Sequence, residues 1–140
     1  MATFGTPYEG RDEIIVPLVY QYLSDNSVLN LGLFTNSSGT LGPTSLIGDI
    51  SEPSGTGYAA YALEGTWSSS NGVVTYSDGS PANPQFENTG GTDWVGDITG
   101  AYISGAPGVT YYLLHFKFFS SPITLQPGQV LEIDISSLLS

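Results

Sequence analysis

The chain has 140 residues and a formal net charge of −11, because only two cationic side chains, Arg11 and Lys117, accompany 13 acidic ones. Phosphate backbones and anionic membrane surfaces are bound through several Lys and Arg side chains, so nucleic-acid and membrane-surface binding are excluded. The chain contains no Cys, which also excludes disulfides and thiol catalysis. The length is that of one domain, and without a long apolar run or a basic leader we expect no membrane span and no export signal.

The N-terminal region is predicted to be an arm over residues 1–12, followed by a single domain over 13–140. The arm is polar and includes a proline and a glycine, a composition that is also typical of a frayed terminus. Glu13–Tyr20 is predicted to be a strand at an edge or bulge, because Pro17 cannot donate to a ladder. The helical spacing of apolar residues in Val16–Leu23 leaves a short helical turn as the alternative.

Short alternating segments then recur along the chain, and each is bounded by turn residues. In the first of them Leu29, Leu31 and Leu33 alternate with other residues, so they are predicted to face a core. The next candidates for strands are Tyr58–Leu63, Gly72–Tyr76, Gln85–Asn88 and Asp97–Ser104.

Thr110–Phe119 is the longest predicted strand, and both of its faces carry apolar side chains. Such a strand is expected to be central in a sheet or to lie at a subunit contact. Strict alternation predicts two faces, one with Tyr112, Leu114, Phe116 and Phe118 and the other with Tyr111, Leu113, His115, Lys117 and Phe119.

The last predicted strand presents Leu131, Ile133 and Ile135 to the core. About eight short strands without a long helical pattern indicate an all-β protein, a two-sheet antiparallel jelly-roll-like sandwich. A domain with few charges, many tyrosines and long strand edges aggregates unless those edges are covered, and a closed symmetric oligomer covers them. We therefore expect a homotrimer.

Three carboxylate pairs are candidates for acid/base sites, but none has the context of one. Glu132 and Asp134 share the exposed face of a strand, which makes them solvated surface groups. Asp93 and Asp97 lie in a Gly-rich stretch that leaves a calcium loop open as an alternative, although the spacing fits no known calcium motif. Asp49 with Glu52 is the third pair, and its simplest role is structural. We expect no enzymatic activity, no cofactor and no metal.

His115 is the single histidine of the chain. It has neither a Cys nor a second His with which to build a zinc site or a thiol–imidazole pair. We expect it to be a partly buried strand residue.

Aromatic residues suggest a second kind of site. Trp94 and Tyr76 are candidates for an exposed platform on which a host glycan stacks, whereas core packing or burial at a protein interface is the more common use of such rings.

Several short motifs resemble those of small structural proteins from tailed bacteriophages. The resemblance covers most of the chain, with Ala101 and the stretch before Gly57 as departures. It is carried by Leu33-Phe34-Thr35-Asn36, Asp49-Ile50-Ser51-Glu52, Gly57-Tyr58-Ala59 with Leu63 and Trp67, Phe86, Gly100-Ala101-Tyr102-Ile103, and the tail from Pro122-Ile123-Thr124-Leu125 through Gly128, Leu131 and Ile133.

This resemblance implies a virion component, a capsid cement or decoration protein that binds the major capsid protein as a trimer on the capsid surface. Such a protein is assembled in the bacterial cytoplasm and acts by binding alone. Phe4, Tyr8 and Arg11 of the arm are the expected capsid-binding residues. The alternative is an adhesion module of a tail fibre or spike, with Trp94 and Tyr76 binding a host glycan.

Overall fold

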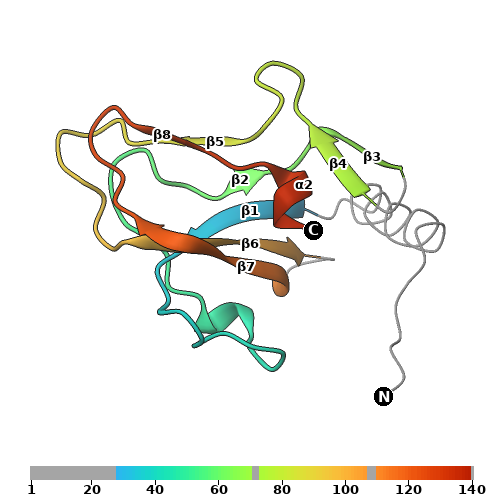
Figure 1. Cartoon of the computed structure of the whole chain (residues 1–140), viewed down its shortest axis with the longest axis horizontal. Coiled ribbons are helices and arrows are strands. Elements are labelled where there is room, and N and C mark those ends of the chain that lie inside the picture. Colours follow the sequence, from blue (N-terminus) through green and yellow to red (C-terminus); the bar gives the residue numbers. More distant parts are fainter. Residues whose placement is uncertain (1–27, 71–72, 107–109, 140) are drawn as a thin grey trace.

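The computed structural model describes residues 28–70, 73–106 and 110–139 (Figure 1). Over these ranges the protein is all-β, with antiparallel strands and only two short helical segments. The predicted arm at 1–12 and the predicted strand or helical turn within 13–23 lie outside the described residues. The elements are β1 (Val28–Phe34), η1 (Ile47–Asp49), β2 (Tyr61–Ala62), β3 (Thr66–Ser70), β4 (Val73–Ser77), β5 (Gln85–Glu87), β6 (Ile98–Ala106), β7 (Tyr112–Ile123), β8 (Val130–Glu132) and α2 (Ile135–Leu138).

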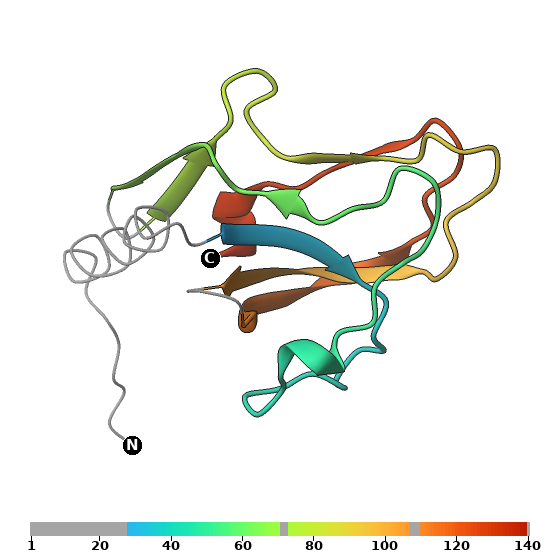
Figure 2. The same cartoon turned by 180° about the vertical axis from the view of Figure 1, so that it is seen from behind.

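The largest sheet has four strands in the order β2-β1-β6-β7. Its central pair is regular, because β1 and β6 stay in register from Val28 opposite Ala106 to Phe34 opposite Gly100. Two further pairs, β3-β4 and β5-β8, complete the strand pairing. Figures 1 and 2 show that β5 and β8 lie over one face of the large sheet, whereas the segment that contains η1 lies on the opposite side.

Both faces of the large sheet are therefore covered by apolar contacts. The main core lies on the β5–β8 side, where Leu29, Leu31 and Leu33 are at most 3% exposed, which confirms their predicted orientation. Ile133 and Ile135 join this core and Leu131 packs against it, as predicted. The smaller core is built from Phe34, Leu41 and Tyr102, against which Ile47, Ile50, Leu113, Phe116 and Phe118 pack.

Strand β7 departs from the sequence prediction in its faces. Within the described residues it lies at the edge of the four-stranded sheet and not in its centre, which leaves the predicted alternative, a subunit contact, as a prediction. Ile103 pairs with His115 but Ser104 pairs with Leu113, so the ladder skips Leu114. Such a bulge reverses the alternation of side chains. Leu113 consequently packs on the side of Phe116 and Phe118, not on the opposite face as predicted.

Other elements differ in extent from their prediction. Strand β3, which carries the buried Trp67, was not predicted, and only Tyr61–Ala62 of the candidate Tyr58–Leu63 is a strand. The last strand ends at Glu132, because Asp134 caps a short helix by accepting the backbone N–H of Ser136 at 3.0 Å. The helix keeps Ile135 in the core although it leaves the strand geometry.

Candidate interaction surface

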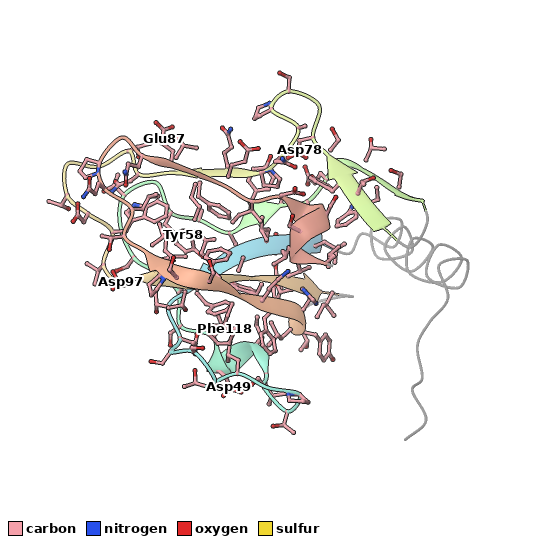
Figure 3. All side chains as sticks on the ribbon, in the orientation of Figure 1. Asp49, Tyr58, Asp78, Glu87, Asp97 and Phe118 are labelled. Atoms are coloured by element: carbon pink, nitrogen blue, oxygen red, sulfur yellow. The ribbon has the colours of Figure 1, made fainter. Side chains whose placement is uncertain are left out.

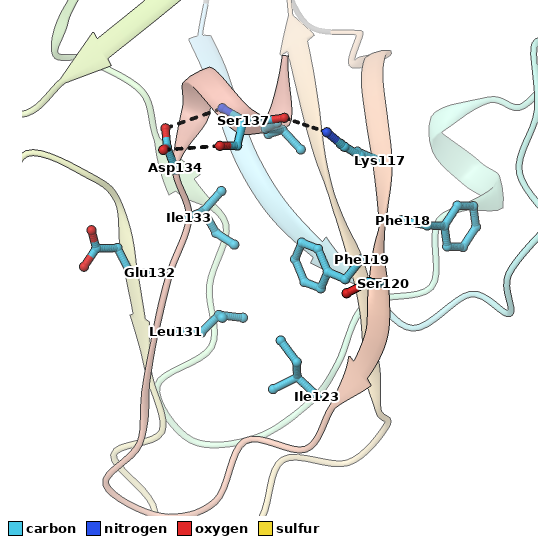
Figure 4. Close-up of a pocket in the computed structure, with 11 residues that line it drawn as sticks. Lys117, Phe118, Phe119, Ser120, Ile123, Leu131, Glu132, Ile133, Asp134 and Ser137 are labelled. Carbon is cyan, nitrogen blue, oxygen red and sulfur yellow. Dashed lines mark hydrogen bonds between the residues drawn. The ribbon is translucent and has the colours of Figure 1, made fainter. Parts of the chain in front are cut away.

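A groove of about 360 Å³ runs between β7 and the segment from β8 to α2 (Figure 4). Phe119 and Ile123 of β7 point into it from one side, and Leu131 and Ile133 point into it from the other. All four side chains belong to the main core or pack against it. The groove is thus a place where the apolar core reaches the surface.

Helix α2 closes one end of this groove by hydrogen bonds to β7. The Lys117 ammonium donates to the Ser137 carbonyl at 2.7 Å. His115 Nε2 lies 2.7 Å from the Leu138 carbonyl, a distance at which a protonated Nε2 donates to that oxygen. His115 is therefore a half-buried strand residue, as predicted, and its bond holds the C-terminal helix on the sheet.

Exposed apolar side chains gather at the start of β7, beside its bulge. Tyr111, Tyr112 and Leu114 are 46%, 52% and 42% exposed. Over residues 28–70, 73–106 and 110–139, β7 pairs with β6 alone, so its other edge offers backbone donors and acceptors. An open edge with apolar side chains is a surface on which another strand or another protein binds.

The Glu52 cluster, formed by Glu52, Tyr58 and Tyr102, joins a loop to the large sheet. Both tyrosine hydroxyls donate to Oε1 of Glu52, that of Tyr58 at 2.8 Å. The Tyr58 hydroxyl also accepts the Leu33 backbone N–H at 3.1 Å. Burial raises the pKa of Tyr58 and of Tyr102 well above that of an ordinary tyrosine, and Glu52 raises both further.

The Asp78 cluster, formed by Asp78, Tyr61 and Tyr76, repeats this chemistry at the end of the β3–β4 hairpin. Tyr61 donates to Oδ2 of Asp78 and Tyr76 to Oδ1, while the Tyr76 hydroxyl accepts the Gly65 N–H at 2.9 Å. The hydrogen bond to Asp78 is the main cause that raises the pKa of Tyr61 to about 12. Figure 3 places Tyr58 between the sheet and the β5–β8 pair and Asp78 beyond β4.

The glycan-platform residues are buried, contrary to the expectation of an exposed Trp94. Trp94 is 3% exposed, and its ring nitrogen donates to the Thr56 carbonyl at 3.0 Å. Tyr76 is 5% exposed and its ring packs edge-on against Trp67 at 4.8 Å between centroids. Neither ring has an open face for a sugar, because each serves the core and has its polar atom bonded within the protein. Phe4, Tyr8 and Arg11 lie outside the described residues.

Asp49, Asp97 and Glu132, three of the carboxylates singled out in the sequence, are engaged in local structure, whereas Asp93 is exposed. Asp49 accepts the Leu46 N–H at 2.8 Å at the start of η1, and Asp97 accepts the Thr124 hydroxyl at 2.7 Å. Glu132 accepts the Asn83 amide at 2.9 Å. No group of three or more His, Cys, Asp or Glu residues in the described ranges is arranged to hold a metal ion.

Buried Asn88 is a polar residue that the sequence analysis missed. It is 1% exposed, and its amide donates to the carbonyls of Thr92 and Leu125, both at 2.9 Å. Its side-chain oxygen accepts the Gly90 N–H at 3.0 Å. These bonds fix the Gly-rich stretch for which the sequence leaves a calcium loop as an alternative. An Asn before a Gly-Gly turn was the only signal in the sequence.

Among the described residues, no helix is long and apolar enough to cross a membrane. No family model, curated protein or solved structure matches this chain.

Proposed function

We propose that this chain is a structural protein of a tailed-phage virion, a homotrimeric cement protein that binds neighbouring major capsid protein subunits. It acts at the capsid surface after assembly in the bacterial cytoplasm, and it acts by binding, without catalysis. The observation that carries this proposal is the start of β7, where Tyr111, Tyr112 and Leu114 are exposed beside an open strand edge. Tyrosine side chains are enriched in protein interfaces.

The positions of the phage-like motifs support a structural role. The acidic turn that contains Glu52, the segment that begins at Gly57, and the segment that begins at Gly100 are far apart in sequence. Their members Glu52, Tyr58 and Tyr102 meet in one hydrogen-bonded cluster. This meeting supports a role of the motif set in maintaining the fold. For the fold itself we propose the jelly-roll-like sandwich, with β5–β8 as the core of the second sheet.

Binding to a shell would stabilise it by mass action. A protein that binds the assembled shell but not the free subunits lowers the free energy of the assembled state. The arm residues Phe4, Tyr8 and Arg11 are proposed to add contacts to the capsid. In this proposal, deletion of residues 1–11 weakens attachment to the shell and leaves the fold intact, and unchanged attachment would remove the arm from the proposal.

Co-sedimentation with mature shells that lack the protein tests the proposal directly, together with light scattering for the mass. Tyr112→Ser combined with Leu114→Ser removes two exposed apolar side chains from β7. We expect this double variant to bind shells at least tenfold more weakly. Leu46→Ser combined with Val95→Ser is the matched control, because these side chains are 70% and 72% exposed elsewhere on the molecule. We expect the control to bind like the parent protein.

Two results would overturn the proposal. Equal loss of binding in both double variants would show that β7 has no special part in attachment. Binding to host cells but not to shells would favour the tail-fibre alternative, in which the glycan would have to bind elsewhere than the buried Trp94 and Tyr76.

A further inference from the structure

Asp78 and Gly79 begin the loop that follows β4, and theirs is the one Asp-Gly sequence in the chain. An aspartate side chain cyclises most readily before glycine, because glycine has no Cβ to obstruct the approach of its backbone nitrogen. Both residues are exposed, and a Cβ built at Gly79 would meet no atom within 4 Å. The surrounding chain therefore leaves room for this reaction.

The reaction needs no enzyme and no co-reactant other than water. The Gly79 nitrogen attacks Cγ of the protonated Asp78 carboxyl group. The nitrogen gives up its proton and Cγ gives up its hydroxyl, so one water leaves and a succinimide ring forms. Water then adds to one of the two ring carbonyls. Cleavage of the new bond from Cγ to nitrogen restores aspartate, whereas cleavage of the original peptide bond leaves the chain running through Cβ and Cγ, which is isoaspartate.

Two tyrosine hydroxyls hold the Asp78 carboxylate in the folded protein (Figure 3). That of Tyr61 donates to Oδ2 and that of Tyr76 donates to Oδ1, so both oxygens are engaged. Tyr76 is 5% exposed, its ring packs on Trp67, and its hydroxyl also accepts the Gly65 N–H at 2.9 Å. Because the Tyr76 ring is fixed in the core, the carboxylate cannot turn toward Gly79 without losing its partners.

The attacking nitrogen is engaged as well. The Gly79 N–H donates to the Ser77 hydroxyl at 3.2 Å. The Asp78 N–H donates to the Ala82 carbonyl at 2.9 Å, which holds the backbone on the other side of the reacting pair. Ring closure therefore requires hydrogen bonds to break at the carboxylate and at the nitrogen, and each bond that must break adds to the barrier.

We propose that Asp78 is a modification site, an aspartate that converts to isoaspartate through Gly79, and that the hydroxyls of Tyr61 and Tyr76 slow this conversion in the folded protein. The product has one more carbon in its backbone, and its carboxylate is attached directly to Cα. We therefore expect the conversion to open the Asp78 cluster. This proposal concerns the chemical stability of the free protein and is independent of the virion proposal.

Comparison of the folded and unfolded full chain tests the protection. The protein is incubated at neutral pH with and without urea, and a peptide that contains Asp78 is analysed by electron-transfer fragmentation, which distinguishes isoaspartate from aspartate. We expect isoaspartate to form at Asp78 in urea, and to form at least tenfold more slowly in the folded protein.

Removal of the hydroxyls tests their part in the protection. We expect Tyr61→Phe to raise the rate in the folded protein about fivefold, the factor that corresponds to one hydrogen bond. Combined with Tyr76→Phe it should raise the rate at least tenfold. Circular dichroism verifies that each variant is folded. If the double variant does not fold, Tyr61→Phe alone decides, because the hydroxyl of Tyr61 is the more exposed of the two.

Tyr102→Phe is the matched control. It also removes a tyrosine hydroxyl that donates to a carboxylate, but in the cluster around Glu52. If isomerisation proceeded through global unfolding, this substitution would accelerate it too. We expect the rate at Asp78 to be unchanged in this variant.

The outcomes separate the site from its protection. Absence of isoaspartate at Asp78 in urea would overturn the site itself. Equal rates with and without urea, or a folded Tyr61→Phe protein that reacts like the parent, would overturn the role of the hydroxyls. Equal acceleration by Tyr61→Phe and Tyr102→Phe would overturn that role as well, because it would assign the protection to global stability.

Discussion

The Glu52 cluster and the Asp78 cluster use the same chemistry in different surroundings. In each, one carboxylate accepts hydrogen bonds from two tyrosine hydroxyls. The Glu52 cluster lies against the central strands of the large sheet, and burial is the largest influence on the pKa of both of its tyrosines. In the Asp78 cluster burial is also the largest influence on the pKa of Tyr76, whereas for Tyr61 the hydrogen bond to Asp78 outweighs burial. Because the hydrogen bonds are alike in number and burial differs at Tyr61, we expect burial to set the difference in what the two clusters contribute to stability.

Substitution of a glycine that lies next to each cluster should have the largest effect on the free energy of unfolding. A Cβ at Gly32 would overlap the ring of Tyr102, and a Cβ at Gly65 would overlap the carbonyl of Ser77. Gly32 lies in β1, which is held by strands on both sides, whereas Gly65 precedes the β3–β4 hairpin, which pairs with no further strand of the described residues. We expect Gly32→Ala to lower the free energy of unfolding by about 3 kcal/mol and Gly65→Ala by about 1 kcal/mol.

Urea unfolding measures both glycine variants, and a second substitution identifies the cause. If the Tyr102 ring is the obstacle, Gly32→Ala should cost less than about 1 kcal/mol when Tyr102 is already Leu. An undiminished cost in that background would show that the strain arises in the backbone of β1 instead.

Removal of each carboxylate is the next test. Glu52→Ala leaves the buried Tyr102 hydroxyl without its acceptor, so we expect a loss of about 2 kcal/mol. Asp78→Ala should cost less, about 1 kcal/mol: water can replace the carboxylate at the half-buried Tyr61, and the buried Tyr76 hydroxyl keeps its hydrogen bond from the Gly65 N–H. Urea unfolding at neutral pH gives both values. Glu52→Gln keeps an acceptor oxygen and is the control, and a larger loss for Asp78→Ala than for Glu52→Ala would reverse the proposed ranking.

Alkaline pH should disturb the Asp78 cluster first. An ordinary tyrosine has a pKa of about 10, whereas the hydrogen bond to Asp78 raises the pKa of Tyr61 to about 12. Between these values the folded protein binds more protons than the unfolded chain, so the free energy of unfolding falls as pH rises. Tyr61→Phe removes this contribution. Its stability should therefore decline less than that of the parent from pH 9.5 to 11.5 (roughly the window between the two pKa values), and identical slopes in urea unfolding would contradict the shift.

The sequence pattern predicted correctly which side chains face the core where that depends only on the residues of one strand. The alternation of Leu29, Leu31 and Leu33 was sufficient to orient β1, because a period of two with one buried face leaves a single arrangement. The faces of β7 could not be predicted in this way. Its bulge at Leu114 follows from the register with β6, and a register is a property of two strands together.

Burial of individual aromatic residues was also beyond the reach of the sequence. The sequence around Trp94 and Tyr76 does not distinguish a ring that binds a sugar from a ring that fills a core. Their burial depends on the tertiary fold, in which the Thr56 carbonyl and the Gly65 N–H satisfy their polar atoms. Glu52 and Tyr58 were noticed as parts of motifs, but their contact with Tyr102 depends on the tertiary fold.

The smallest effects are expected from Tyr→Phe substitutions, each of which removes a single hydroxyl group, at neutral pH. Tyr102→Phe removes a buried hydroxyl that bonds to a carboxylate, and we expect a loss of about 1.5 kcal/mol. Tyr61→Phe should cost about 0.5 kcal/mol or less, since its hydroxyl reaches water when unbonded and its ring still packs on Phe86. Thermal or urea unfolding of the two variants measures the difference. If the two losses are equal, burial of the hydroxyl is not what separates the clusters, and the hydrogen bond to the carboxylate must then contribute alike in both.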